Sequence, residues 1–209
     1  MSIVRRDFDK EAALWDENTT RLKLASDIAN SIFAEMDLDG TQNVLDFGCG
    51  TGLLTFYLQP NARSVTGIDS SHKMIEIFEN KATALGLNCV SGKCLNVENG
   101  DRITGSYQLV MSSMAFHHVK DIRLLLEQLY DVTASGGMLC IADLDSDNGQ
   151  FHDDNMGIFH FGFERQKLVA LLTEIGFCGI KHKTAATVTK TGADGETRSF
   201  TVFLVSAKK

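Results

Sequence analysis

Residues 44–52 read VLDFGCGTG, and this stretch decides the fold. A short apolar run contains the acid Asp46, and glycines then alternate at Gly48, Gly50 and Gly52. Because glycine loses more conformational freedom on folding than any other residue, three within five positions indicate a tightly turning backbone that something approaches closely. The stretch therefore predicts a buried strand that ends in a ligand-binding loop.

The bulk composition is that of an ordinary globular chain. It has 209 residues, of which 44% are hydrophobic and 22% are charged, and this fits one large domain. No apolar run approaches the roughly 20 residues that a membrane helix needs, and the opening MSIVRRDFDKEAALWDE lacks the apolar core of a signal peptide. A formal charge of -7 disfavours binding to phosphate backbones, so we expect neither a nucleic acid nor a membrane as partner.

The cysteines point to a reducing compartment. They are odd in number, widely spaced, and form neither a CxxC pair nor a zinc spacing: Cys49, Cys89, Cys94, Cys140 and Cys178. Such a pattern is typical of reduced thiols, and we expect a cytoplasmic protein.

Short apolar runs alternate with amphipathic stretches along the chain. The spacing of apolar residues predicts helices over residues 10–36, 53–58, 71–85, 121–132 and 164–175, and strands over 44–47, 64–68, 89–90, 107–111, 138–142, 181–188 and 198–206. Strands that alternate with helices predict an α/β fold with a doubly wound, mostly parallel sheet. The last two strands flank a Gly-Ala-Asp-Gly turn and predict an antiparallel C-terminal hairpin.

The glycine loop and a second acid limit which class of ligand the crevice can bind. A dinucleotide fingerprint reads G-x-G-x-x-G, whereas here the spacing is G-x-G-x-G with Asp46 two residues before the first glycine. A carboxylate that faces the crevice repels a diphosphate and suits an amino group, which favours a cationic ligand over NAD. Asp69, 17 residues after Gly52, ends the second strand and can accept hydrogen bonds from ribose hydroxyls with either ligand. Alternatively, Asp69 only caps the following helix, as Ser70 or Ser71 also could.

VLDFGCGTG and VTGIDSSHKMI (65–75) together resemble the first two motifs of the class I S-adenosylmethionine-dependent methyltransferases. MSSMAFHHV (111–119) resembles the segment after the fourth strand in the small-molecule, ubiquinone/menaquinone-biosynthesis-like branch, and GFERQKLVALLTEIGF (162–177) the helix and sixth strand behind its active-site loop. The resemblance implies a seven-stranded Rossmann-like sheet in a single domain. Residues 1–40 would form a helical cap, 41–143 the cofactor-binding half, and 144–209 the acceptor-side loop, helix and hairpin.

The resemblance also implies how the cofactor, S-adenosyl-L-methionine, is held. Asp46 would anchor its methionine end, and Asp69 its ribose. Where the family often has an acid that contacts adenine, this chain has Lys93, which cannot accept that hydrogen bond, so the backbone of Cys94 would take over. The cofactor-binding residues implied are Asp46, Gly48, Cys49, Gly50, Thr51, Gly52, Asp69, Ser70, Met74, Cys94, Leu95 and Ser112.

His117 and His118 are the candidate catalytic residues. They follow the fourth strand on the cofactor side of the sheet, and one of them would face the acceptor as a base or as an orienting donor. The alternative is that both are structural, or that His118 caps the helix that begins near Asp121.

A long loop after the fifth strand is the second candidate region. It contains possible metal ligands, but no spacing among them is diagnostic, so we predict no metal: Asp143, Asp145, His152, Asp153, Asp154 and His160. We expect instead a loop that faces the acceptor, with an apolar pocket made from Phe151, Phe159, Phe161 and Phe163. Near the N-terminus, Phe8 and Trp15 either fold over the cofactor as a lid or pack as a helical stripe.

The absence of certain motifs limits the class of molecule that can accept the methyl group. Pro60 is the only proline, so the Pro-Pro-Tyr motif of amino-methylating DNA enzymes is absent, as is the three-cysteine cluster of radical enzymes. The sequence therefore predicts methyl transfer to a small molecule by in-line displacement. An NAD-dependent oxidoreductase and a non-catalytic S-adenosylmethionine-binding module are the alternatives.

Overall fold

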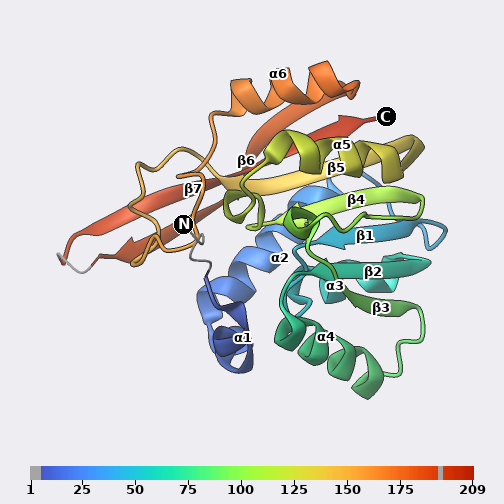
Figure 1. Ribbon diagram of the computed structural model, residues 1–209, viewed down its shortest axis with the longest axis horizontal. Coiled ribbons are helices and arrows are strands. Elements are labelled where there is room, and N and C mark those ends of the chain that lie inside the picture. The colour runs from blue at the N-terminus through green and yellow to red at the C-terminus, as the bar shows by residue number, and fades with distance from the viewer. Residues whose placement is uncertain (1–5, 193–194) are drawn as a thin grey trace.

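The computed structural model describes residues 6–192 and 195–209, and these form one sheet with helices on both faces (Figure 1). The strand order is β3-β2-β1-β4-β5-β7-β6, and of these seven described strands β7 alone runs opposite to the other six. The strands are β1 (Asn43–Phe47), β2 (Ser64–Asp69), β3 (Val90–Cys94), β4 (Tyr107–Ser113), β5 (Thr133–Leu144), β6 (Cys178–Thr191) and β7 (Thr197–Lys208). The predicted doubly wound α/β fold with its C-terminal hairpin is confirmed. Ala193 and Asp194 of the predicted turn lie outside the described residues.

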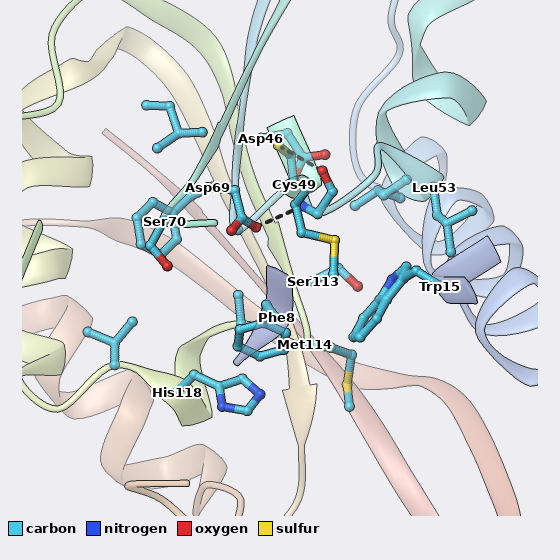
Figure 2. Close-up of a pocket in the computed structure, with 18 of the residues that line it drawn as sticks. Phe8, Trp15, Asp46, Cys49, Leu53, Asp69, Ser70, Ser113, Met114 and His118 are labelled. Carbon is cyan, nitrogen blue, oxygen red and sulfur yellow. Dashed lines mark hydrogen bonds between the residues drawn. The ribbon is translucent and has the colours of Figure 1, made fainter. Parts of the chain in front are cut away.

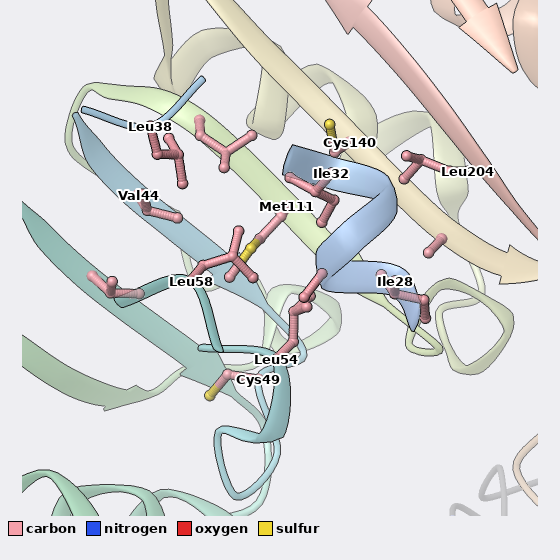
Figure 3. Close-up of a cluster of buried hydrophobic side chains, with 14 of the residues drawn as sticks. Ile28, Ile32, Leu38, Val44, Cys49, Leu54, Leu58, Met111, Cys140 and Leu204 are labelled. Carbon is pink, nitrogen blue, oxygen red and sulfur yellow. The ribbon is translucent and has the colours of Figure 1, made fainter. Parts of the chain in front are cut away.

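Two helical layers cover the sheet, and each has its own apolar core. The helices are α1 (Phe8–Glu11), α2 (Thr19–Phe33), α3 (Leu53–Leu58), α4 (His72–Ala84), α5 (Ile122–Val132) and α6 (Arg165–Ile175). Alternate residues of β4 face opposite layers, because side chains along a strand point alternately to its two sides. Met111 lies in the core that α2 and α3 cover (Figure 3), whereas Val110 lies in the core that α5 and α6 cover. None of the described helices is long and apolar enough to cross a membrane.

The helix predicted over residues 10–36 is confirmed only from Thr19 to Phe33, because the chain breaks at Asn18. The side-chain oxygen of Asn18 accepts hydrogen bonds from the backbone N–H groups of Thr20 and Arg21, at 3.0 and 3.1 Å, and so caps α2. Before this cap lie only the four-residue α1 and a 3-10 turn, η1 (Ala12–Glu17). The other predicted elements are present, although the strand predicted near 89–90 extends to Cys94 and the one predicted at 138 begins at Thr133.

The order of the strands determines where a ligand can bind. From β1 the chain builds outward to β2 and β3 on one side, and then to β4 and β5 on the other. In the parallel register, Phe47 at the end of β1 pairs with Ile68 and Ser112 near the ends of β2 and β4. The loops that follow these three strands therefore meet at one edge, at the switch point where open α/β sheets bind ligands.

Candidate active site

A pocket opens at this edge (Figure 2). The loops after β1, β2, β3 and β4 form its wall, and the segment before α2 together with α2 itself covers it. The residues that line it are Phe8, Trp15, Arg21, Leu24, Ala25, Asp46, Phe47, Gly48, Cys49, Gly50, Leu53, Leu54, Ile68, Asp69, Ser70, Met74, Leu95, Asn96, Val97, Glu98, Ser113, Met114, Ala115, His118 and Val119.

Asp69 ties the glycine loop to the second strand. One carboxylate oxygen accepts a hydrogen bond from the backbone N–H of Gly50, and the other from that of Ser71, both at 2.9 Å (Figure 2). Burial raises the pKa of Asp69, although these N–H donors oppose the shift. The cap of α4 is Ser71, whose hydroxyl accepts a hydrogen bond from Met74 N at 3.1 Å. Asp69 therefore does not cap the helix, and its carboxylate faces the pocket.

The first two glycines serve different needs. Gly48 has a φ of +71°, and a Cβ there would lie 2.3 Å from the Cβ of Ala115, so only glycine lets these loops pack together. Gly50 has a φ of +53°, and a Cβ there would meet Trp15 Nε1 and Met74 Sδ only at 3.8 and 3.9 Å. Its backbone is therefore open to the pocket. Such a bare backbone beside a carboxylate fits a nucleoside ligand.

Asp46 is buried at the floor of the pocket. It is 1% exposed, and the hydroxyl of Thr55 donates a hydrogen bond to its Oδ2 at 2.6 Å. Burial, with a smaller contribution from the nearby charge of Asp69, raises the pKa of Asp46 to about 7. A cationic group in the pocket would favour the ionised form of this carboxylate and so bind to it.

Of the two candidate catalytic histidines, His118 lines the pocket and His117 does not. Because a carbonyl oxygen only accepts hydrogen bonds, the 3.0 Å contact with Gly157 O places a proton on His118 Nδ1 and leaves Nε2 as an acceptor. Burial, with the neighbouring His117, lowers the pKa of His118 to about 3. The alternative role of His118 as a helix cap is wrong, since Asp121 caps α5 by accepting from Leu124 N at 2.9 Å.

His117 lies behind this wall, in contact with a buried acid. Its ring is 1% exposed, and its Nδ1 lies 2.6 Å from an oxygen of the fully buried Asp143. Burial alone would raise the pKa of Asp143, but the ring and two backbone N–H donors outweigh it, so the pKa lies below its ordinary value. The backbone carbonyl of His117 also accepts hydrogen bonds from Phe159 and His160 of the loop after β5. His117 thus fastens that loop to the turn that carries His118.

Most of the predicted cofactor residues line the pocket: Asp46, Gly48, Cys49, Gly50, Asp69, Ser70, Met74 and Leu95. Four others lie behind its wall or beside it. Thr51 donates its hydroxyl proton to Asp16 at 2.5 Å, and Ser112 donates to Phe47 O at 2.8 Å. Gly52 packs against Phe56 and Phe78 at the start of α3, and the thiol of Cys94 lies 3.6 Å from the carbonyl of Ser70. These four residues therefore support the pocket instead of lining it.

The loop after β5 differs from the sequence expectation in one respect. None of Phe151, Phe159, Phe161 and Phe163 lines the pocket, so the prediction that they form it is wrong. Phe151 packs edge-on against Phe200, and Phe163 against Phe203, because the hairpin offers these rings an apolar surface. Within the described residues, no group of three acidic, histidine or cysteine side chains is arranged to hold a metal ion.

Phe8 and Trp15 line the pocket, which favours the lid over the helical stripe. Arg21, Ser113 and Met114 also line it, and these three were not predicted. Arg21 stacks its guanidinium 3.7 Å from the ring centroid of Trp15 on the same wall. The sequence gives no local signal for Arg21, because it reaches the pocket only through the packing of α2. Ser113 and Met114 adjoin the histidines, and their place at the end of β4 could have identified them.

Comparisons with known proteins agree with this geometry. A family model described as a methyltransferase domain matches residues 44–137. The chain is 31% identical over 150 residues to an uncharacterized methyltransferase of Schizosaccharomyces pombe, covering 62% of this chain and 51% of that protein. It is 29% identical over 173 residues to a malonyl-[acyl-carrier protein] O-methyltransferase of Acetivibrio thermocellus, covering 79% and 56%. The chain thus spans about half the length of these curated relatives.

Solved structures share the fold. The YcgJ protein of Bacillus subtilis superposes with a TM-score of 0.72 at 13% identity, covering 87% of this chain and 98% of that one. A SAM-dependent methyltransferase of Aquifex aeolicus superposes with a TM-score of 0.70 at 20% identity, covering 95% and 97%. The motifs, the methyltransferase-domain match over residues 44–137, the relatives and the shared fold all support a class I S-adenosylmethionine-dependent methyltransferase with S-adenosylmethionine as its cofactor.

Proposed function

We propose that this chain transfers a methyl group from S-adenosylmethionine to a small, largely apolar molecule that presents one protic nucleophile. One observation carries the proposal: a single pocket extends from the carboxylate of Asp69 to the neutral ring of His118. The names of two relatives, a malonyl-[acyl-carrier protein] O-methyltransferase and a ubiquinone biosynthesis O-methyltransferase of Erwinia tasmaniensis, favour oxygen as the nucleophile. The five unpaired cysteines support a cytoplasmic location.

The residues on the wall fit the cofactor group by group. Asp69 accepts from the ribose hydroxyls, and the bare backbone at Gly50 allows a close approach. Asp46 binds the ammonium of the methionine end, and Arg21, the one Lys or Arg side chain on the described wall, its carboxylate. Met74 borders the adenine. When bound, S-adenosylmethionine supplies a methyl group on a sulfonium, which is already activated for transfer.

His118 orients the acceptor. Its Nδ1–H is held by Gly157 and its ring by the edge of Phe8, at a centroid distance of 4.9 Å, so the lone pair of Nε2 has a fixed direction. With a pKa of about 3 the ring is neutral near pH 7 and a weak base. It therefore accepts a hydrogen bond from the nucleophile and aligns it. Alignment of this kind supplies up to roughly 7–11 kcal/mol of barrier lowering.

The surroundings of His118 favour an uncharged acceptor. Phe8 and Met114 lie beside it on the pocket wall (Figure 2), and neither carries a charge. Arg21, the one Lys or Arg side chain on the described wall, is assigned to the carboxylate of the cofactor. A phosphorylated acceptor would thus lose its hydration without gaining a cation.

Transfer of a labelled methyl group tests the proposal. The protein is incubated with methyl-tritiated S-adenosylmethionine and a cell extract that has been separated into small molecules, protein and nucleic acid. We expect label in the small-molecule fraction alone, with strongly reduced transfer by Asp69→Asn and His118→Phe variants. Label in protein or nucleic acid would contradict the proposed acceptor class. If S-adenosylhomocysteine binds and no fraction is labelled, the chain is a non-catalytic binding module.

A further inference from the structure

Residues Arg6–Glu17, which we name the N-terminal strap, cross the open side of the pocket. On the cofactor side the strap is fastened by two acids. Asp9 accepts hydrogen bonds from the Ser71 hydroxyl and from Lys73 N, the latter at 3.1 Å, at the start of α4. Asp16 accepts from the Thr51 hydroxyl and pairs with Lys81. This side of the strap is therefore anchored to the elements that hold the cofactor.

On the acceptor side the strap has one polar contact with the loop after β5. Arg6 Nη1 lies 3.3 Å from His152 Nδ1, a residue 146 positions away in the sequence. The guanidinium is aimed by Glu11, whose oxygens accept from Arg6 Nε and Nη2 at 2.6 and 3.0 Å. The loop is itself fixed to β6, because Lys190 Nζ donates to Phe151 O at 2.6 Å. The contact thus joins two supported segments.

The acceptor end of the pocket lies under the strap between these anchors. The Phe8 ring stands edge-on to His118, with centroids 4.9 Å apart, and edge-on to Trp15, with centroids 5.9 Å apart (Figure 2). Both aromatic rings line the pocket. An acceptor that reaches His118 from solvent has to displace them.

We propose that Arg6 and His152 are positioning residues that latch the N-terminal strap over the acceptor end of the pocket, and that the acceptor enters when this latch opens. The proposal rests on the proposed function for the identity of the ligands. The latch itself is a property of the protein without ligands and can be tested separately.

The latch requires a neutral His152. Because arginine only donates hydrogen bonds, Nδ1 must offer its lone pair, and the ring proton is then on Nε2, which is buried without a hydrogen-bond partner among the described residues. A second proton would place two positive charges in contact. The charged or titratable groups around His152 are Arg6, His117, His118 and Lys190, with Glu11, Asp143 and Asp153 paired to Arg6, His117 and Lys190.

The sign of the pH dependence follows. Burial, with the neighbouring His117, lowers the pKa of His152 to about 3, whereas an open strap returns it toward the ordinary 6.5. Closure is therefore fully favoured above about pH 6.5 and weakens about tenfold per pH unit below it for each histidine released. His118, under the same strap, adds a second proton to this dependence.

Trp15 provides the readout, because it is the only tryptophan in the chain. Its fluorescence quenching by acrylamide is measured with and without S-adenosylhomocysteine in the wild type, Arg6→Gln, His152→Leu and His152→Asn. Asparagine keeps an acceptor where Nδ1 lies, so it should behave like the wild type. Arg6→Gln and His152→Leu should raise the open fraction about tenfold, and they should also speed S-adenosylhomocysteine release. Arg123→Gln, which removes an exposed pair with Glu174, is the matched control.

Each outcome decides for or against the latch. Quenching that rises in Arg6→Gln and His152→Leu, stays low in His152→Asn and Arg123→Gln, and rises in the wild type below about pH 6.5 supports it. Equal quenching in all variants overturns it. So does equal quenching in His152→Leu and His152→Asn, since ring packing and not the hydrogen bond would then hold the strap. Failure of S-adenosylhomocysteine to bind would instead contradict the proposed function, while quenching of the free protein still tests the latch.

Discussion

Replacing Asp69 by asparagine tests the cofactor site at one atom. The two carboxylate oxygens accept hydrogen bonds from Gly50 N and Ser71 N, which are both donors. An amide keeps one acceptor and turns the other atom into a donor, so it must either face one of these N–H groups or turn its NH₂ toward the ribose. Either orientation removes a hydrogen bond that the carboxylate makes.

The magnitude follows from the contacts. A hydrogen bond to a charged group contributes about 1.5–3 kcal/mol, so Asp69→Asn should weaken S-adenosylhomocysteine binding roughly 10- to 100-fold. Loss of the hydrogen bond from Gly50 N or Ser71 N should reduce the free energy of unfolding by about 1–3 kcal/mol. Protonation removes the same acceptor, so affinity in the wild type should fall as the pH drops through the raised pKa of Asp69.

Isothermal titration calorimetry measures the affinity, and urea unfolding checks that the variant is folded. The matched control is Asp39→Asn, which alters a carboxylate that accepts from the N–H and hydroxyl of Thr41, away from the pocket. Unchanged affinity in a folded Asp69→Asn variant would refute the ribose assignment. An equal loss in Asp39→Asn would show that the effect is general.

Three further predictions follow from the site. Gly48→Ala should lower the free energy of unfolding by about 2–5 kcal/mol, because the new Cβ meets Ala115. Gly50→Ala should lower it by only about 1–2 kcal/mol and should mainly weaken S-adenosylhomocysteine binding. Urea unfolding measures the stability of both variants and calorimetry their affinity, and equal stability would contradict the packing argument. His118→Phe should reduce methyl transfer about 10- to 100-fold near pH 7, where the ring is neutral; an undiminished rate in a folded variant would remove His118 from the alignment of the acceptor. Asp143→Asn should cost about 1.5–3 kcal/mol of stability near pH 7, because it weakens a buried hydrogen bond to a charged carboxylate. Because the pKa of Asp143 is lowered, its contribution is present above about pH 4 and is lost as the pH falls through the folded-state pKa, so unfolding of the variant should be less sensitive to acid.

The spacing of apolar residues predicted most of the fold, because in most elements that spacing agrees with the helix or strand that the segment forms in the structure. The helix predicted over residues 53–58 has those bounds in the structure, since apolar residues and a left-handed glycine at its start specify it. The N-terminal helix failed because apolar periodicity continues across Asn18, while the side chain of that residue caps α2. Periodicity alone does not reveal such competition.

Site residues at the ends of strands could be predicted from the sequence. Site residues that are brought together only by the packing of distant segments could not. Asp46 and Asp69 lie at the ends of strands whose neighbours in the sheet could be inferred, so both were expected at the pocket that they now line. His117 lies in the turn after β4 and Asp143 in the adjacent β5, yet no local signal indicated that they pair with each other. Arg6 and His152 meet only through the tertiary fold, and their contact had no sequence signal at all.

A crystal structure of the protein with S-adenosylhomocysteine would show how the pocket holds the cofactor. We expect the ribose hydroxyls on the carboxylate of Asp69, the amino group toward Asp46, and the sulfur on the side of the pocket that His118 faces. A ligand that occupies the pocket in the reverse direction, or binds elsewhere on the protein, would contradict this expectation.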